Sequence, residues 1–552
     1  MAYRYDELKF GSVRGIDGNI ITVKVEDLKL QYQEKEYFVE VGCFVNCGGH
    51  HGDTVCVINK IHIEEVERKD GPVEIKIAEL NILGGLDEND IFVRGIDTLP
   101  TLNSNVYLIA GEDVNNILGV NEEYTDENGI KKNKNFKVGI RPIKGAGEVY
   151  LNLDKFLGRH VAIIGTTGSG KSCTVASIVQ SILRNYPYPR LLFFDIHNEY
   201  TNAFKGEWEQ LSRSIEWNEF SLPYWFLDLE EFIGIYHGGN AGANQEAKLK
   251  EWITELKRKN IENVSENKLL IERISVDSPI YFDIDELIEK IDEAIGAKTT
   301  TSSDKNTYLK MKLKIQDINN DSRYEFLKKD KGLEKDLATY FVELLGLGEE
   351  NKYLNILDLS GIPSEVRTVC IGVLSRLCFD YCYWDIDPEN LPLGLVLEEA
   401  HNYIPDEEGA EFSLCRKRIE KIAKEGRKYG LSLIVVSQRP SNVSTTVLSQ
   451  CGTFIALRLT NDLDQNKIKK LLPDVLGNQA NILPSLKDGE ALVSGDAIKL
   501  PGKVYFNQPN PEPKSNDVRY HHSWTVGVPD NYSVKNIIED WKLRERSRQE
   551  EN

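Results

Sequence analysis

The sequence predicts an α/β protein whose central sheet is mostly parallel. A glycine-rich loop, Gly165-x4-Gly170-Lys171-Ser172, connects an apolar run at 161–164 to a run with helical spacing at 174–183. Five further short apolar runs are separated by segments with helical periodicity, and they lie at 191–195, 354–359, 394–398, 432–437 and 453–459. Strands that alternate with helices in this way are typical of parallel sheets.

We expect three further parts around this core, because 552 residues are too many for one compact core. Residues 1–125 contain alternating runs such as Asn19–Val25 between glycine- and aspartate-rich turns, which predict a small antiparallel barrel or sandwich. Helical periodicity predicts a helical subdomain at 205–345, inserted between core segments 126–204 and 346–500. Several prolines from Pro501 onward predict an extended C-terminal arm, 501–552, that ends in a short polar helix.

The composition is that of an ordinary globular protein, with 41% hydrophobic and 28% charged residues. No apolar run approaches the length of a membrane span, and the N-terminal residues lack the apolar core of a signal peptide. We therefore expect a cytoplasmic protein with no membrane partner, whose nine cysteines are reduced thiols. A net charge of −20 argues against non-specific coating of nucleic acid, but it leaves a local basic channel possible.

The loop at 165–172 predicts the binding of ATP or GTP. Its glycines let backbone N–H groups converge on phosphate oxygens, Lys171 reaches the β and γ phosphates, and the Ser172 hydroxyl can bind Mg²⁺. The strand before the loop and the helix after it distinguish this pattern from a chance glycine-rich turn. The predicted nucleotide contacts are Gly165, Thr166, Thr167, Gly168, Ser169, Gly170, Lys171, Ser172 and Cys173.

A second pattern, Leu-Val-Leu-Glu-Glu-Ala-His at 395–401, is an apolar strand that ends in two carboxylates. In ATPases with such a loop, one acid at this place holds Mg²⁺ and another activates the attacking water. We expect Glu398 to bind Mg²⁺ through water and Glu399 to orient or deprotonate the water. Alone, such a strand end is unremarkable, and the upstream phosphate loop is what favours the catalytic interpretation.

The predicted strand at 431–437 is followed by Gln438-Arg439-Pro440. A polar side chain there can reach the γ-phosphate, so Gln438 is a candidate sensor of hydrolysis. Arg427 or Arg439 could stabilise transition-state charge within one chain or from a neighbouring subunit, although each could equally form a surface ion pair. Because the loop contains no arginine of its own, we expect an oligomer in which a neighbour completes the site.

Taken together, these stretches resemble the HerA-type ATPases, in the wider HerA/FtsK group of P-loop DNA translocases. The matching stretches lie at 158–172, 195–200, 357–363, 398–401, 425–430, 437–440 and 449–451. The resemblance implies a RecA-like core, an N-terminal β-barrel, and a homohexameric ring that moves along double-stranded DNA by sequential ATP hydrolysis. It also implies that Asp195 and Glu199 lie near the nucleotide, that Glu399 is the catalytic acid, and that Arg427 or Arg159 is contributed across the interface.

The leading hypothesis is an ATP-driven double-stranded DNA translocase or helicase, an ATPase that uses Mg²⁺. By resemblance, it would be bacterial and work with a NurA-like nuclease or a sirtuin-type NAD hydrolase, in DNA end processing or antiphage defence. The alternative is a ring-shaped scaffold that binds ATP mainly to assemble and gate a partner effector. Two departures from the family matter. Glu398 stands where an aspartate is common, and the helical insert matches no family stretch, so that DNA-contacting loops stay unassigned.

Three other patterns leave their meaning open. The spacing of Cys43, Cys47, His50, His51 and Cys56 is poor for structural zinc, which prefers two separated ligand pairs. The basic residues between Arg416 and Lys428 lie on a predicted helix that either faces DNA or is a solvated face. The aromatic tail around Trp524 predicts a contact with a neighbouring subunit.

Overall fold

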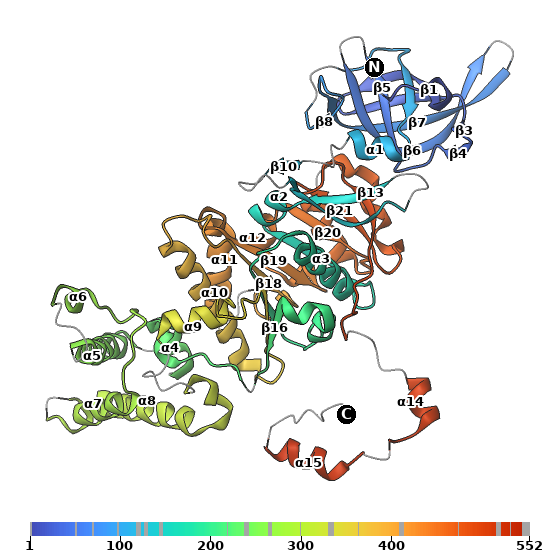
Figure 1. Cartoon of the computed structure of the whole chain (residues 1–552). Helices are drawn as coiled ribbons and strands as arrows, with labels where there is room; N and C mark the ends of the chain where they lie inside the picture. The colour runs from blue at the N-terminus through green and yellow to red at the C-terminus, as the bar shows by residue number, and fades with distance from the viewer. Residues whose placement is uncertain are drawn as a thin grey trace. The chain divides into compact units, whose positions relative to one another are not determined.

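Figure 1 shows a computed structural model of the chain, which divides into two compact units. The first comprises 1–189, 387–401 and 422–513, and the second comprises 190–386, 402–421 and 514–552. We describe each unit by itself. The structure describes residues 3–49, 52–68, 71–95, 99–117, 123–125, 131–142, 147–217, 219–236, 242–262, 268–298, 300–328, 336–362, 364–407, 413–472, 474–514, 520–529 and 532–543.

An antiparallel β-barrel forms the N-terminal part of the first unit. Its strands follow the order β2-β1-β9-β5-β6-β7-β8, and a further pairing of β2 with β7 closes the ring. Side chains such as Phe10, Val45, Ile58 and Leu80 are fully buried, and buried residues alternate with more exposed ones along β2, as expected of a small barrel. The predicted N-terminal antiparallel fold is confirmed. Its strands are β1 (Lys9–Asp17), β2 (Ile20–Val25), β5 (Phe44–Gly48), β6 (Asp53–Arg68), β7 (Gly71–Leu86), β8 (Phe92–Val93) and β9 (Asn105–Leu108).

The rest of the first unit contains a sheet with a parallel half and an antiparallel half, in the order β13-β12-β22-β21-β20-β14-β19-β18. The parallel strands are buried along their whole length, as expected of strands covered on both faces. They are β14 (Val161–Ile164), β18 (Leu393–Leu397), β19 (Leu431–Ser437) and β20 (Thr453–Ala456). The antiparallel strands are β12 (Asn135–Ile140), β13 (Glu148–Asn152), β21 (Glu490–Gly495) and β22 (Gly502–Phe506).

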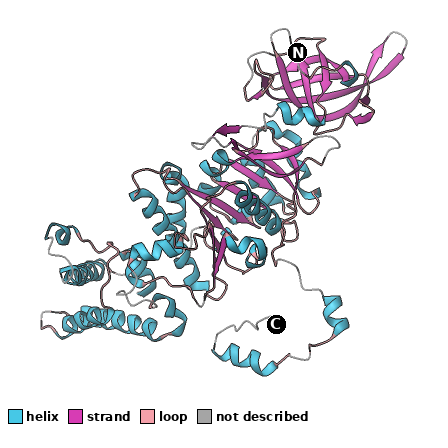
Figure 2. Ribbon diagram, viewed as in Figure 1, coloured by secondary structure: helices cyan, strands magenta, loops and turns pink. Residues whose placement is uncertain are grey.

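The second unit contains parallel strands in the order β15-β17-β16 and a group of helices. Figure 2 shows that the segment from α4 to α9 consists of helices and loops. In this segment α7 packs on α8, and Leu287 and Ile291 of α7 are fully buried. The main elements are β15 (Leu191–Asp195), β16 (Ser212–Ile215), α4 (Leu229–Tyr236), α5 (Ala243–Glu262), α7 (Ile284–Gly296), α8 (Ser302–Asn320), α9 (Leu337–Leu344), β17 (Leu354–Asp358), α10 (Ser364–Trp384) and α11 (Ser413–Glu425).

Two short strands lie where the sequence predicts other structure. β16 lies in the range expected to be helical, and β22 lies in the range expected to be an extended arm. In β22, Val504 and Phe506 are buried and the prolines lie on either side of the strand, which is why it can join the sheet. After it come α14 (Tyr520–Val526), which has no buried residue, and α15 (Val534–Leu543). None of the described helices is both long and apolar enough to cross a membrane.

Candidate active site

The glycine-rich loop connects β14 to α3 (Lys171–Asn185) and has a backbone that only glycine accommodates. Gly168 and Gly170 adopt positive φ angles of 71° and 86°. A Cβ added to Gly165 would lie 2.5 Å from Ser169 Oγ, and one added to Gly170 would lie 2.7 Å from the Gly489 nitrogen. The glycines therefore give the loop the compact geometry that lets N–H groups approach phosphate oxygens.

Three of the predicted motifs meet at one edge of the sheet, because β14, β19 and β18 are parallel neighbours. The glycine-rich loop follows β14, Gln438 follows β19, and Glu398 follows β18. The carboxyl ends of neighbouring parallel strands lie side by side, which is where open α/β sheets bind ligands. The strand order thus explains why segments more than 200 residues apart in the sequence form one site.

Lys171 connects the loop to the acid pair. Its Nζ lies 2.7 Å from Glu399 Oε1 and 3.2 Å from Glu398 Oε1, and all three side chains are buried. Burial opposes the charge on Lys171, but the two carboxylates outweigh it and raise the pKa of its ammonium group. In this state the lysine neutralises the acids, and it must change partners to bind phosphate.

Glu399 is the most densely contacted group of the site. Its Oε1 also accepts a hydrogen bond from Gln438 Nε2 at 2.5 Å, and Gln438 Oε1 accepts one from Thr167 Oγ1 at 2.6 Å. His401 Nδ1 lies 3.2 Å from Glu399 Oε2. Burial alone would favour the neutral acid, but the hydrogen bond from His401 and the charge of Lys171 lower the pKa of Glu399 to about 2. Glu399 is therefore an ionised carboxylate at neutral pH.

Comparison with known proteins finds similar chains in sequence and in structure. VirB4 of Thermoanaerobacter pseudethanolicus aligns with 70% of this chain and 98% of its own, at 15% identity and a TM-score of 0.48. A protein named "DNA double-strand break repair helicase HerA" from Pyrococcus furiosus is 25% identical over 483 residues, 80% of each chain. A "Probable DNA double-strand break repair helicase HerA" from Methanocaldococcus jannaschii is 29% identical over 462 residues, 79% of this chain and 86% of that protein. Residues 137–378 match the family described as "Helicase HerA, central domain". The chain is a P-loop ATPase whose central part resembles that of the HerA helicases.

The three arginines considered as candidates for the trans arginine differ in their surroundings. Arg427 and Arg439 are exposed, and neither makes an ion pair within the described part of the chain. The side chain of Arg159 is 59% exposed, but its Nη1 lies 2.7 Å from Asp496 Oδ2. Arg159 would have to leave Asp496 to reach a neighbouring site, whereas Arg427 and Arg439 would not have to break such a pair.

Asp195 and Glu199 belong to the second unit. Asp195 is fully buried and its carboxylate accepts hydrogen bonds from the N–H groups of His197, Glu199 and Tyr200. Burial raises the pKa of Asp195 to about 6, and these hydrogen bonds limit the rise. Within its unit, Asp195 thus shapes the loop that follows β15.

Most of the basic helix α11 forms contacts inside the second unit. Arg418 pairs with Asp228, Arg416 pairs with Glu420, and Lys421 lies over the ring of Phe379 at 4.4 Å. These basic side chains were candidates for DNA contact in the sequence, and in the structure they already have partners within the unit. The cysteines considered for zinc are also in apolar surroundings, because Cys47 and Cys56 are fully buried in the barrel with their sulfurs 3.9 Å apart. His50 and His51 lie outside the described residues.

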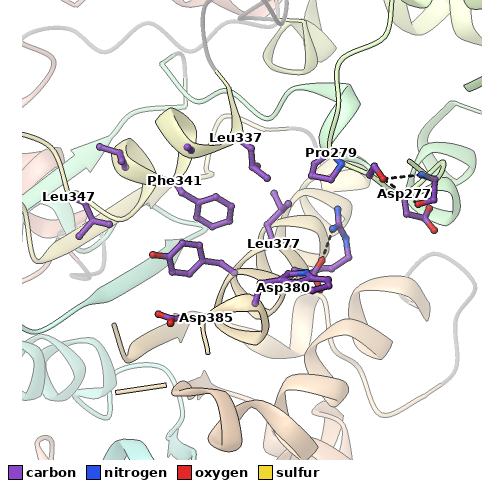
Figure 3. A pocket seen from close by; sticks show the side chains of 15 residues that line it. Asp277, Pro279, Leu337, Phe341, Leu347, Leu377, Asp380 and Asp385 are labelled. Atoms are coloured by element: carbon purple, nitrogen blue, oxygen red, sulfur yellow. Dashed lines mark hydrogen bonds and ion pairs between the residues drawn. The ribbon is translucent and has the colours of Figure 1, made fainter. Parts of the chain in front are cut away.

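The second unit also contains a cavity of about 990 Å³, lined by α9, α10 and the segment at 275–279. Figure 3 shows Leu337, Phe341 and Leu377 around it. Its wall includes Arg376 and Asp380, which form an ion pair at 2.9 Å. None of the predicted site residues is among the described residues that line this cavity.

Proposed function

We propose that this protein is an ATP-driven double-stranded DNA translocase or helicase that acts as a cytoplasmic homohexameric ring. The observation that carries the proposal is the meeting of Lys171, Glu399 and Gln438 at one edge of the sheet, with the lysine and the amide in contact with the carboxylate. This set suits phosphoryl transfer to water, which needs charge stabilisation and a positioned nucleophile more than covalent chemistry. DNA as the track is inferred from the names of the HerA relatives.

Each side chain has a separate role in this proposal. Lys171 moves from the acids to the β and γ phosphates, while the backbone N–H groups of the loop hold the remaining phosphate oxygens. The Ser172 hydroxyl and the Glu398 carboxylate, through water, would hold Mg²⁺, since hard oxygen ligands are those it prefers. Bound Mg²⁺ neutralises phosphate charge. Glu399 orients or deprotonates the attacking water, and Gln438 responds to loss of the γ-phosphate.

We further propose that a neighbouring subunit supplies Arg427 to the site. The exposure of Arg427 and its lack of an ion pair in the described chain support this role over Arg159. Mixing Lys171→Ala subunits with Arg427→Ala subunits tests it, because rings of both contain some sites with an intact loop and an intact arginine. We expect each variant alone to lose at least about 10²-fold in turnover and the mixture to regain part of it. A mixture as inactive as its components would contradict supply from a neighbour.

The test of the whole proposal is ATP hydrolysis by the purified chain, with and without linear double-stranded DNA, and with Glu399→Gln as background. We expect DNA to stimulate hydrolysis and the variant to abolish it. The exposed Glu389 offers a matched control, since Glu389→Gln makes the same chemical change away from the site. Hydrolysis that ignores DNA would instead favour a scaffold that uses ATP to assemble and gate a partner effector. Whether the protein is a translocase or a scaffold, we propose the same partner. It would be a NurA-like nuclease or a sirtuin-type NAD hydrolase that acts in DNA end processing or antiphage defence.

A further inference from the structure

We propose that His401 is a positioning residue for ATP hydrolysis, which holds one oxygen of Glu399 while nucleotide binding changes the partners of the other oxygen. The inference rests on the proposed role of Glu399 as the group that activates water. His401 lies two residues beyond Glu399, in the short helix Ala400–Asn402, and its side chain is half-buried. It belongs to neither the glycine-rich loop nor the strand that carries Gln438.

The two carboxylate oxygens of Glu399 have different sets of donors. Oε1 accepts from Lys171 Nζ at 2.7 Å and from Gln438 Nε2 at 2.5 Å. Oε2 lies 3.2 Å from His401 Nδ1 and 3.4 Å from the Gln438 main-chain nitrogen. The ammonium of Lys171 and the side-chain amide of Gln438 therefore contact Oε1, while the imidazole of His401 contacts Oε2.

Nucleotide binding acts directly on the Oε1 set. Lys171 must turn toward the β and γ phosphates, because that is the function of the lysine in this loop. The amide of Gln438 is connected to the loop through the hydrogen bond from Thr167, so it also responds when phosphate enters. Once Lys171 has left, the hydrogen bond to Oε2 is the contact that can keep the carboxylate in place.

The geometry requires a proton on His401 Nδ1. A carboxylate oxygen only accepts hydrogen bonds, so the 3.2 Å contact with Glu399 Oε2 is favourable when Nδ1 is the donor. The same nitrogen lies 3.2 Å from Ser437 Oγ, which accepts a hydrogen bond from the Arg439 N–H at 3.1 Å. The imidazole therefore connects Glu399 to the end of β19, where Gln438 and Arg439 also lie.

The backbone of Glu399 gives a reason for this support. Its φ angle is +47°, in the left-handed region that residues with a side chain rarely adopt. Such conformations persist at functional sites only when the surroundings hold them. Because the backbone of Glu399 turns in this way directly after β18, its carboxylate needs contacts on both oxygens to keep a fixed orientation.

Substitutions at His401 distinguish a role in positioning the Glu399 carboxylate from a role in packing alone. His401→Asn places an amide N–H near the position of Nδ1, whereas His401→Gln places its amide farther out, near the position of Nε2. We expect His401→Ala and His401→Gln to lower kcat about 10- to 100-fold, with the KM for ATP and the affinity for a non-hydrolysable ATP analogue within twofold of the parent. His401→Asn should recover kcat to within about threefold, and thermal melts should show that the variants are folded.

The outcomes distinguish this inference from the proposed function. If Glu399→Gln is inactive while His401→Ala turns over normally, only the role of His401 is wrong. If Glu399→Gln still hydrolyses ATP, the proposed role of Glu399 fails first. An Asn variant as slow as the Gln variant would overturn positioning through Nδ1, and this comparison decides even if the Ala variant does not fold. Adding His401→Ala to Glu399→Gln should cost nothing further, because both act through one carboxylate.

Discussion

Two buried glutamates, one in each unit, are held by cations in different ways. Glu399 is 2% exposed and pairs with Lys171, and Glu231 on α4 is fully buried and pairs with Arg376 on α10. Arg376 approaches Glu231 with two nitrogens, Nε at 2.7 Å and Nη2 at 2.8 Å, and Nη2 also donates to the Phe226 carbonyl. A planar guanidinium held at several points is a permanent connection, whereas an ammonium on a flexible stem can turn to a new partner.

The pKa values of the two glutamates shift in opposite directions. At Glu231 burial is the largest effect, and it raises the pKa despite the charge of Arg376. At Glu399 the donors His401 and Lys171 overcome burial and bring the pKa down to about 2. A counter-ion therefore does not by itself show that a carboxylate favours its charge. Glu231 also accepts the Asp228 N–H at 3.0 Å, so the number of donors does not separate the two glutamates. Glu399 is suited to chemistry because its donors include the lysine of the phosphate loop, and Glu231 is suited to joining α4 to α10.

The strongest test of this comparison makes the same substitution at both places. We expect Glu399→Gln to lower ATP turnover at least about 10³-fold, because an amide can neither accept the proton of water nor attract it as an anion does. Glu231→Gln should leave turnover per folded molecule within twofold. Phosphate release at saturating ATP, normalised to the folded fraction, measures both. Equal losses in the two variants would contradict the division between chemical and structural glutamates.

The same pair of variants should also differ in stability. Glu231→Gln leaves the charge of Arg376 in a buried place with less compensation, which we expect to cost about 3 kcal/mol of unfolding free energy. Replacing Glu231 and Arg376 together by leucine and methionine should cost less than the sum of the single changes. Urea unfolding followed by circular dichroism checks this. An additive double variant would mean that the two side chains act independently.

Much of the site could be predicted from the sequence, because its motifs lie at the ends of apolar strands. The loop ending in Ser172, the acids at the end of β18, and Gln438 after β19 each have a local signature. The order of the parallel strands, β14-β19-β18, then brings them together, and the α/β pattern predicts that the strands are parallel but not this order. The mostly parallel sheet and the N-terminal antiparallel fold are confirmed, and the roles of the individual site residues stay predictions.

Other features depend on tertiary contacts that no local pattern encodes. Arg159 pairs with Asp496, more than 300 residues away in the sequence. Arg418 pairs with Asp228, the residue that directly precedes α4. The antiparallel strand β22 joins the sheet through Val504 and Phe506, although prolines flank it on both sides. Such pairings form only when distant segments meet. The sequence alone therefore does not show which basic residues have an acidic partner, or whether a strand flanked by prolines joins the sheet.

The smallest expected effect concerns Lys257 on α5, a buried base that donates hydrogen bonds to two main-chain carbonyls. Its Nζ donates to the Val276 carbonyl at 2.6 Å and to the Ser278 carbonyl at 2.7 Å. Burial is the main cause that lowers the pKa of Lys257 to about 7. A neutral amine has two N–H donors, which matches the two carbonyls. Lys171 and Lys257 extend the comparison, because two carboxylates raise the pKa of Lys171, whereas burial beside neutral carbonyls lowers the pKa of Lys257.

The prediction for Lys257 follows from the proton that it binds on unfolding. In the unfolded chain a lysine has a pKa near 10.4, so above about pH 7 unfolding takes up a proton, and a rise in pH favours the folded state by up to about 1.4 kcal/mol per pH unit. We expect the stability of the parent relative to Lys257→Met to increase by about 1 kcal/mol between pH 7.5 and 8.5. Other titrating groups are the same in both proteins and cancel in this difference. A difference in unfolding free energy between the two proteins that does not change with pH would mean that Lys257 remains charged in the folded protein. Two carbonyls would then suffice to stabilise a buried ammonium group.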